Sequence, residues 1–220
     1  MPSTLSVFIT GGTGYLGTPL IRTLVERGHQ VRALVRSGSE RKLPRGCRAV
    51  VGSALDSAAC ENQIRPSHTF VQLVGVSHPN PSKAAEFHAI DRVSALPAVD
   101  AAVRAGIQHF IYLSVAQPAP MMKSYIAVRA ECEAALGKSG MNVTIVRPWY
   151  VLGPGHSWPY VLLPMYWIRE RIPSTREGAR RLGLVTLDQM TRTLASAVEN
   201  PCVGARLVEV PQIRTGAVAD

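Results

Sequence analysis

The sequence is poor in the residues that organise a small metal-bound or disulfide-bonded protein. Its four cysteines are far apart, and its six histidines show no spacing typical of metal ligands. Scattered thiols of this kind are typical of a reducing compartment. We therefore expect no metal site and no disulfide framework.

Long uncharged segments are also scarce. The longest stretch without Lys, Arg, Asp or Glu is 148–168, which is long enough to span a bilayer but contains four prolines and two glycines. That composition disfavours a membrane helix. The chain opens without a cationic, apolar leader, because residues 5–10 already have the pattern of a β-strand. These absences predict a cytoplasmic protein.

Acidic residues are outnumbered by basic ones. Asp and Glu total 15 against 24 Lys and Arg, which gives a formal net charge of +9. Such an excess favours anionic partners: a phosphorylated cofactor, a nucleic acid or an anionic membrane surface. The densest basic segment has no interleaved aromatic residues, so we expect no nucleic acid partner. Its members are Arg36, Arg41, Lys42, Arg45 and Arg48.

The residues that are abundant indicate a globular core. Hydrophobic residues make up 46% of the chain and charged residues 18%. Short apolar segments rich in β-branched residues alternate with longer segments at helical spacing. Strands are predicted at 5–10, 30–35, 48–51, 69–74, 109–113, 142–146 and 206–210, and helices at 15–27, 83–105, 124–136 and 187–199. Pro97 predicts a kink or break in the second helix.

This alternation predicts the fold class. Repeated strand–helix units imply an α/β protein with a Rossmann-type, doubly wound parallel sheet covered by helices on both faces. No linker or internal repeat divides the chain. We therefore predict a single domain over 1–220, with a core at about 1–150 and a small C-terminal elaboration at about 151–220.

A glycine-rich segment joins the first predicted strand to the first helix. Gly12, Gly14 and Gly17 satisfy G-x-G-x-x-G, and Gly11, Gly14 and Gly17 satisfy G-x-x-G-x-x-G. Glycines in this position permit a tight turn and a close approach to a pyrophosphate, which the helix N-terminus also attracts. We predict that the loop binds a dinucleotide through Gly11, Gly12, Thr13, Gly14, Tyr15, Leu16 and Gly17.

The end of the second predicted strand distinguishes the two nicotinamide cofactors. An NAD site usually has Asp or Glu about 20 residues after the glycine loop, where the carboxylate binds the ribose 2′-hydroxyl. Here Arg36 follows Leu34-Val35, and no carboxylate stands beside it. A guanidinium suits a 2′-phosphate. We predict NADP(H) in preference to NAD(H), the alternative being that Arg36 is a solvated surface charge.

Later motifs carry a resemblance to a known family. Ser114 follows the fifth predicted strand, Tyr125 and Arg129 form Tyr-x-x-x-Arg at the next helix, and Arg147-Pro148 precedes 152–155, Leu-Gly-Pro-Gly. In this order the chain resembles the short-chain dehydrogenase/reductase superfamily, in its extended or atypical branch, among NmrA-like and epimerase/dehydratase-like members. The resemblance implies hydride transfer to or from a small carbonyl or alcohol, with Ser114, Tyr125 and Arg129 at the reactive end. It also implies that Ser53 and Pro148 lie at the cofactor.

The chain departs from the family pattern at this reactive end. Arg129 replaces the family's lysine, and Asp91 replaces an asparagine of the long helix. Tyr125 and Arg129 are four residues apart and share a helix face, so Arg129 supplies positive charge near the phenol. An arginine is nevertheless no geometric substitute for an ammonium group. Two functions stay open: an oxidoreductase, or a non-catalytic NAD(P)-binding redox sensor or structural subunit.

The segment 158–171 has an apolar, aromatic sequence that ends in Arg-Glu-Arg. It fits a pocket wall for an apolar small-molecule substrate, a subunit contact in an oligomer, a contact with a membrane surface, or a helix buried over the sheet. The sequence does not choose among these four interpretations.

Overall fold

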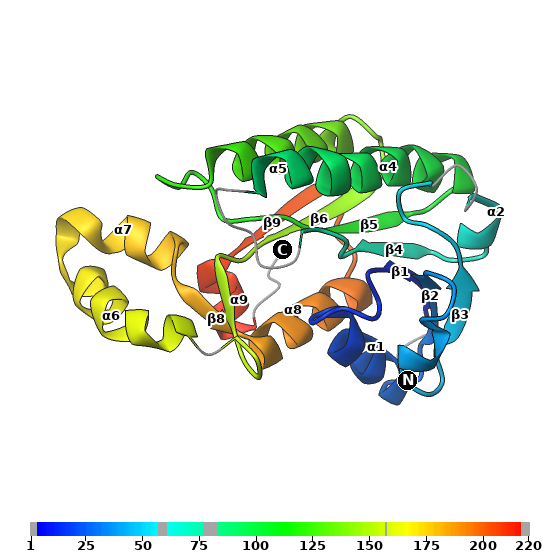
Figure 1. Ribbon diagram of the computed structural model, residues 1–220, viewed down its shortest axis with the longest axis horizontal. Coiled ribbons are helices and arrows are strands. Elements are labelled where there is room, and N and C mark those ends of the chain that lie inside the picture. Colours follow the sequence, from blue (N-terminus) through cyan, green and yellow to red (C-terminus); the bar gives the residue numbers. More distant parts are fainter. Residues whose placement is uncertain (1–3, 57–60, 77–82, 157, 217–220) are drawn as a thin grey trace.

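The computed structural model describes residues 4–56, 61–76, 83–156 and 158–216. Within these residues, parallel strands form a seven-stranded sheet in the order β3-β2-β1-β4-β5-β6-β9 (Figure 1). The strands are β1 (Ser6–Thr10), β2 (Gln30–Val35), β3 (Arg48–Val51), β4 (Thr69–Gln72), β5 (His109–Leu113), β6 (Asn142–Arg147) and β9 (Ala205–Glu209). The sequence prediction of a doubly wound parallel sheet is confirmed.

Helices cover both faces of the sheet because successive strand residues point to opposite sides. Val7 and Ile9 pack under α1 (Gly17–Glu26) and α8 (Leu187–Glu199). Phe8 packs on the other face, under α4 (Val93–Ala105) and α5 (Lys123–Gly137) (Figure 1). The middle of each central strand is therefore mainly apolar, as expected of a sheet buried on both sides.

The long helix before β5 differs from its prediction. It begins with α3 (Ala84–Glu86) and a π-helical segment, η4 (Phe87–Arg92), and α4 then continues through Pro97. The predicted break at Pro97 is wrong. The bond that the proline removes would have gone to Val93, the first residue of α4, so the loss falls at the junction with η4 rather than inside the helix. Gly106 ends α4 in the left-handed conformation, with φ 78°.

The C-terminal part contains the elements that the sequence did not predict. β7 (Tyr150–Leu152) and β8 (Leu184–Thr186) form a small parallel sheet beyond the carboxyl end of β6. Between them, α6 (Leu163–Arg171) and α7 (Pro173–Arg181) form a hairpin that extends away from the central sheet (Figure 1). The remaining elements are η1 (Glu40–Lys42), α2 (Glu61–Ile64), η5 (Trp158–Leu162) and α9 (Val210–Thr215).

Candidate functional site

Every segment with a predicted functional residue lies at one edge of the sheet. Parallel strands end on the same side, so the loops that follow β1, β2, β4, β5 and β6 meet there. The strand order also reverses at this edge, because β2 lies on one side of β1 and β4 on the other. Such a switch point is where open α/β sheets bind their ligands.

The glycine loop is shaped by contacts that leave no room for a side chain. Gly11 has φ +73°, and a Cβ there would lie 3.0 Å from the carbonyl carbon of Leu73. A Cβ on Gly17 would overlap the Gly11 carbonyl oxygen and lie 2.7 Å from the Gly12 Cα. The start of α1 therefore packs directly on the backbone of the loop, as the third glycine of the fingerprint requires.

The N-terminus of α1 is open to an anion. Its first turn has no acidic residue, and Leu16, which precedes the helix, makes no side-chain capping bond. Thr13 and Gly14 are exposed at the tip of the loop. Free N–H groups and the positive end of the helix dipole fit a pyrophosphate, so the residues present fit the dinucleotide that the motif predicts.

Tyr15 connects the glycine loop to the C-terminal part. Its ring stacks on His156, with ring centroids 4.3 Å apart. Its buried hydroxyl has no hydrogen-bond partner among the described residues, and a Cβ on Gly153 would overlap it. Burial, followed by the nearby Tyr160, raises the pKa of Tyr15. Gly153 thus belongs to the site because a larger residue would displace Tyr15.

Arg36 and Ser53 lie at the ends of neighbouring strands. Arg36 directly follows β2 and is exposed, and its side chain makes no ion pair or hydrogen bond with the part of the chain that the structure describes. Ser53 follows β3, and its hydroxyl accepts the Leu55 N–H at 3.2 Å. Val35 and Val51 are register partners. The two side chains therefore border the same end of the crevice.

Tyr125 and Arg129 are brought together on α5. The Arg129 guanidinium carbon lies 5.0 Å from the centre of the Tyr125 ring and 5.5 Å from the centre of the Tyr112 ring. Phe87 packs against Tyr125 with ring centroids 4.8 Å apart. Both α5 side chains are almost fully buried, Arg129 at 3% exposure. The Tyr125 ring is thus held in place by packing against Phe87 and against a guanidinium that is itself buried.

Arg129 is bound to the protein on most of its donors. Nη2 forms an ion pair with Asp91, and Nη1 donates to the Leu113 carbonyl at 2.5 Å and to the Tyr112 hydroxyl at 3.3 Å. Asp91 also accepts the Val76 N–H at 3.1 Å. A Cβ on Gly75 would overlap Nη2 of Arg129, so the glycine after β4 makes space for the guanidinium.

The electrostatic balance keeps Tyr125 protonated. Burial raises the pKa of Tyr125 above its ordinary value of 10.0, Asp91 acts in the same direction, and Arg129 opposes them without prevailing. Because a neutral phenol is a proton donor, Tyr125 suits proton delivery to a substrate at neutral pH. Burial acts to lower the pKa of Arg129, but Tyr125, Tyr112 and Asp91 together outweigh burial and raise it, so Arg129 stays cationic.

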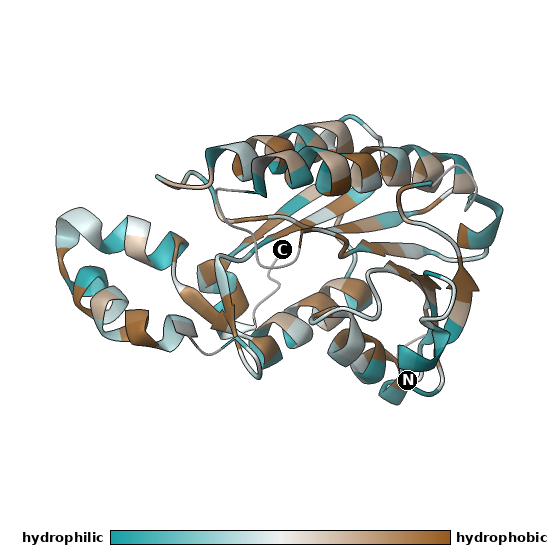
Figure 2. Ribbon diagram, in the orientation of Figure 1, coloured by the Kyte–Doolittle hydropathy of each residue, from teal (hydrophilic) through white to brown (hydrophobic). Residues whose placement is uncertain are grey.

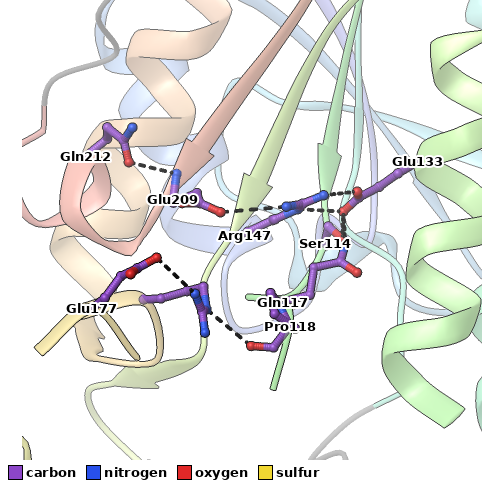
Figure 3. Close-up of polar contacts among 9 residues, drawn as sticks. Ser114, Gln117, Pro118, Glu133, Arg147, Glu177, Glu209 and Gln212 are labelled. Carbon is purple, nitrogen blue, oxygen red and sulfur yellow. Dashed lines mark hydrogen bonds and ion pairs between the residues drawn. The ribbon is translucent and has the colours of Figure 1, made fainter. Parts of the chain in front are cut away.

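Ser114 lies in a separate network from Tyr125. Its hydroxyl bonds to the carboxylate of Glu133, which also accepts Gln117 Nε2 and Arg147 Nε, each at 3.0 Å (Figure 3). Arg147 reaches Glu209 at 3.6 Å, the residue that precedes α9. The Ser114 hydroxyl thus donates its one hydrogen bond to Glu133. Its lone pairs remain able to accept a hydrogen bond from another group.

Pro148 and the residues around it anchor the loop after β6. Pro148 is buried, and its carbonyl accepts the Ala116 N–H at 2.9 Å. Sequence reasoning did not find Glu133 or Gly75 as parts of the site. The position of Glu133, two helical turns after Tyr125, was the only indication, and the same helix offers a second acidic candidate, Glu131.

The described residues contain no group of three or more His, Cys, Asp or Glu side chains arranged to hold a metal ion. None of the helices in the described segments is both long and apolar enough to cross a bilayer.

Comparison with known proteins places the chain in a family. A family model described as NAD(P)H-binding matches residues 11–160. The chain therefore belongs to the NAD(P)H-binding family, which confirms the predicted membership of the short-chain dehydrogenase/reductase superfamily. It is an NAD(P)-binding protein, and the matched region contains both the glycine loop and the Tyr125–Arg129 pair.

Two curated relatives and one solved structure show how far the similarity extends. Ceramide reductase of Caulobacter vibrioides is 26% identical over 212 residues, which are 94% of this chain and 65% of the relative. The 4-hydroxy-2-methyl-3-oxo-4-farnesyl-3,4-dihydroquinoline-1-oxide ketoreductase of Stigmatella aurantiaca is 25% identical over 68% of this chain and 51% of its own length. The chain thus spans less than two thirds of either relative. The Bordetella bronchiseptica enzyme WbmH in complex with NAD+ has a TM-score of 0.69 at 23% identity, over 92% of this chain and 75% of WbmH, and shares the fold.

Proposed function

We propose that this chain is an NADP(H)-dependent oxidoreductase that interconverts a carbonyl and an alcohol on an apolar small-molecule substrate. The observation that carries the proposal is the position of Tyr125, stacked on Arg129, at the sheet edge that also holds the glycine loop. A protonated phenol at this edge is placed to serve a substrate beside the cofactor.

The roles of the chain's residues follow from their contacts. When bound, the nicotinamide supplies the hydride that reduces the carbonyl carbon to an alcohol carbon. Tyr125 donates the proton that the substrate oxygen takes up. Arg129 acts through Tyr125 as a positioning residue, because both of its terminal nitrogens are occupied by Asp91, Leu113 and Tyr112. Ser114 donates its hydrogen to Glu133, so its free lone pairs can accept a hydrogen bond only from a substrate hydroxyl, such as the alcohol form.

The preference for NADP(H) rests on Arg36. Its exposed guanidinium has no partner among the described residues and stands at the strand end where a 2′-phosphate is bound in related sites. Ser53, at the end of the adjacent strand, carries no charge to repel the phosphate. The apolar substrate class is supported by the relatives, since ceramide and a farnesyl group are both long hydrocarbon structures.

Calorimetric titration with NADPH and NADH tests the cofactor. We expect Arg36→Ala to weaken NADPH binding about 10- to 30-fold, the size of a charge-assisted hydrogen bond, and to leave NADH unchanged. Arg22→Ala is the matched control, because Arg22 is an exposed arginine in the middle of α1. Equal losses for both nucleotides in Arg36→Ala would contradict the NADP(H) assignment.

A non-catalytic nucleotide-binding protein is the second candidate. It is favoured by the burial of Arg129, whose guanidinium is bound to Asp91 and is not free to hold a nicotinamide ribose. Screening carbonyl compounds for NADPH oxidation distinguishes the two functions. Turnover that falls at least about 100-fold in Tyr125→Phe supports the oxidoreductase. Tight NADPH binding without turnover on any long-chain carbonyl supports the second candidate.

A further inference from the structure

The segment formed by η5 and α6 exposes several large apolar side chains. Val161, Trp167 and Ile168 have exposed fractions of 75%, 61% and 52%. We define the apolar patch as the seven exposed residues Tyr160, Val161, Leu163, Met165, Trp167, Ile168 and Ile172. Figure 2 shows hydrophobic residues along α6, in the part of the hairpin that extends away from the sheet. Large exposed apolar side chains concentrated in one short segment indicate a binding surface.

The direction of these side chains restricts what can cover them. α6 turns only one line of residues inward: Tyr166 and Glu170 are partly buried, and Glu170 forms an ion pair with Arg214 of α9 at 2.7 Å. The patch residues point elsewhere. With 3.6 residues per turn, Met165 and Trp167 lie roughly 160° apart around the helix axis. A protein surface would cover one side of α6, whereas a fluid medium covers several.

The excess of arginines around the patch indicates that the surface covering it carries negative charge. Residues 158–181 contain five arginines and two glutamates, and one of those glutamates, Glu170, is paired with Arg214. Arg171 stacks on the Trp167 ring, 3.2 Å from its centre, so positive charge lies directly beside the largest patch residue. Two copies of this hairpin would repel each other, which disfavours a second copy of the chain as the occupant.

We propose that the α6–α7 hairpin binds an anionic lipid surface, with the apolar patch inserted shallowly among the headgroups and the arginines in contact with lipid phosphates. Tryptophan and tyrosine prefer this interface, and long arginine side chains reach headgroup depth while their stems stay apolar. The hairpin follows β7 and precedes β8, so binding would hold the carboxyl edge of the sheet near the membrane. The proposal does not depend on the proposed function.

Vesicle flotation with the full chain tests this surface. The probes are phosphatidylcholine vesicles with and without phosphatidylglycerol, at low and high salt. We expect binding to the mixed vesicles at low salt, with a loss of at least about tenfold in Trp167→Ser/Ile168→Ser, since each buried apolar side chain contributes to partitioning. At low salt, Arg171→Gln/Arg176→Gln should lower vesicle binding about tenfold. At high salt, this difference from the unmodified chain should disappear.

Matched controls keep the result specific to the patch. Val203 is 98% exposed and lies outside the apolar patch, so Val161→Ser should weaken vesicle binding while Val203→Ser does not. Arg22→Gln is the control for charge. Unchanged NADPH binding shows that each variant is folded and separates this test from that of the cofactor site.

Three outcomes would overturn the proposal. The first is no binding to mixed vesicles at low salt. The second is equal binding to neutral and anionic vesicles, which would show that charge plays no part. The third is self-association without lipid that disappears in Trp167→Ser/Ile168→Ser, because it would show that a second copy covers the patch instead.

Discussion

The nucleotide end and the reactive end of the sheet edge are built by different means. At the nucleotide end, Gly11 and Gly17 leave no space for a Cβ, so the fit is between backbone atoms. At the reactive end, the fit is between side chains: Arg129 of α5 and Asp91 of η4 form a buried ion pair. A backbone fit tolerates only glycine, whereas a side-chain fit can be rebuilt with a different pair of residues.

The reactive end shows such a rebuilding. From the family pattern, Arg129 and Asp91 are two separate departures. The structure makes them one unit, since the larger guanidinium is neutralised by Asp91 and accommodated by Gly75. Asp91 lies in the π-helical η4, an irregular segment of the type often found at functional sites.

Removing Asp91 is expected to produce the largest effect, because it disrupts the side-chain fit of the reactive end. Asp91→Ala leaves the Arg129 guanidinium buried without its counter-ion, and breaking such a pair lowers the free energy of unfolding by about 3–5 kcal/mol. Urea unfolding of the purified variant measures this loss.

The same two elements supply the control for this prediction. Arg92 of η4 and Glu131 of α5 also form an ion pair, but their side chains are 46% and 44% exposed. We expect Glu131→Ala to change the free energy of unfolding by less than about 1 kcal/mol, because water screens an exposed pair. Equal losses in Asp91→Ala and Glu131→Ala would contradict the importance of burial.

The second prediction tests the backbone fit at the nucleotide end. Gly17→Ala places a Cβ against the Gly11 carbonyl and the Gly12 Cα, and neither is the flexible end of a side chain. We expect a loss of about 1–3 kcal/mol in stability from overpacking, together with loss of measurable NADPH binding because the loop must move. Thermal unfolding and calorimetry measure the two effects.

Gly178→Ala is the matched control for the glycine substitution. Gly178 lies within α7, and a Cβ there would meet no atom within 4 Å. Alanine favours the helix by about 1 kcal/mol over glycine, so this variant should be slightly stabilised and should bind NADPH normally. If Gly17→Ala also bound NADPH normally, the loop would be less constrained than its geometry indicates.

The same contrast explains how much of the molecule could be predicted. The sheet, its helices and the glycine loop depend on periodicity and on backbone sterics, which neighbouring residues reveal. The bond between Ser114 and Glu133 and the pair of Arg129 with Asp91 join residues 19 and 38 positions apart. No local pattern specifies such partners. The hairpin was missed because α6 has no buried residue and hence no amphipathic periodicity.

The smallest expected effect concerns the protonation of Tyr125 at the reactive end. Burial raises the pKa of Tyr125, and Arg129 opposes this effect. A raised pKa in the folded state means that the group stabilises the protein below pH 10 and that this contribution is lost as the pH rises further. Asp91→Asn removes a negative charge near the phenol and leaves Arg129 less neutralised, so the pKa of Tyr125 should fall, by about one pH unit.

Carbon-13 NMR of the tyrosine Cζ, assigned with Tyr125→Phe, measures this titration without a substrate. The ionisable groups around the phenol are Arg129 and Asp91, with Tyr112 and Cys132 next to the guanidinium. Titration of Tyr125 below pH 10 in the unmodified chain would show that Arg129 outweighs burial and acts as the family's lysine does. An unchanged midpoint in Asp91→Asn would show that the ion pair only supports the fold.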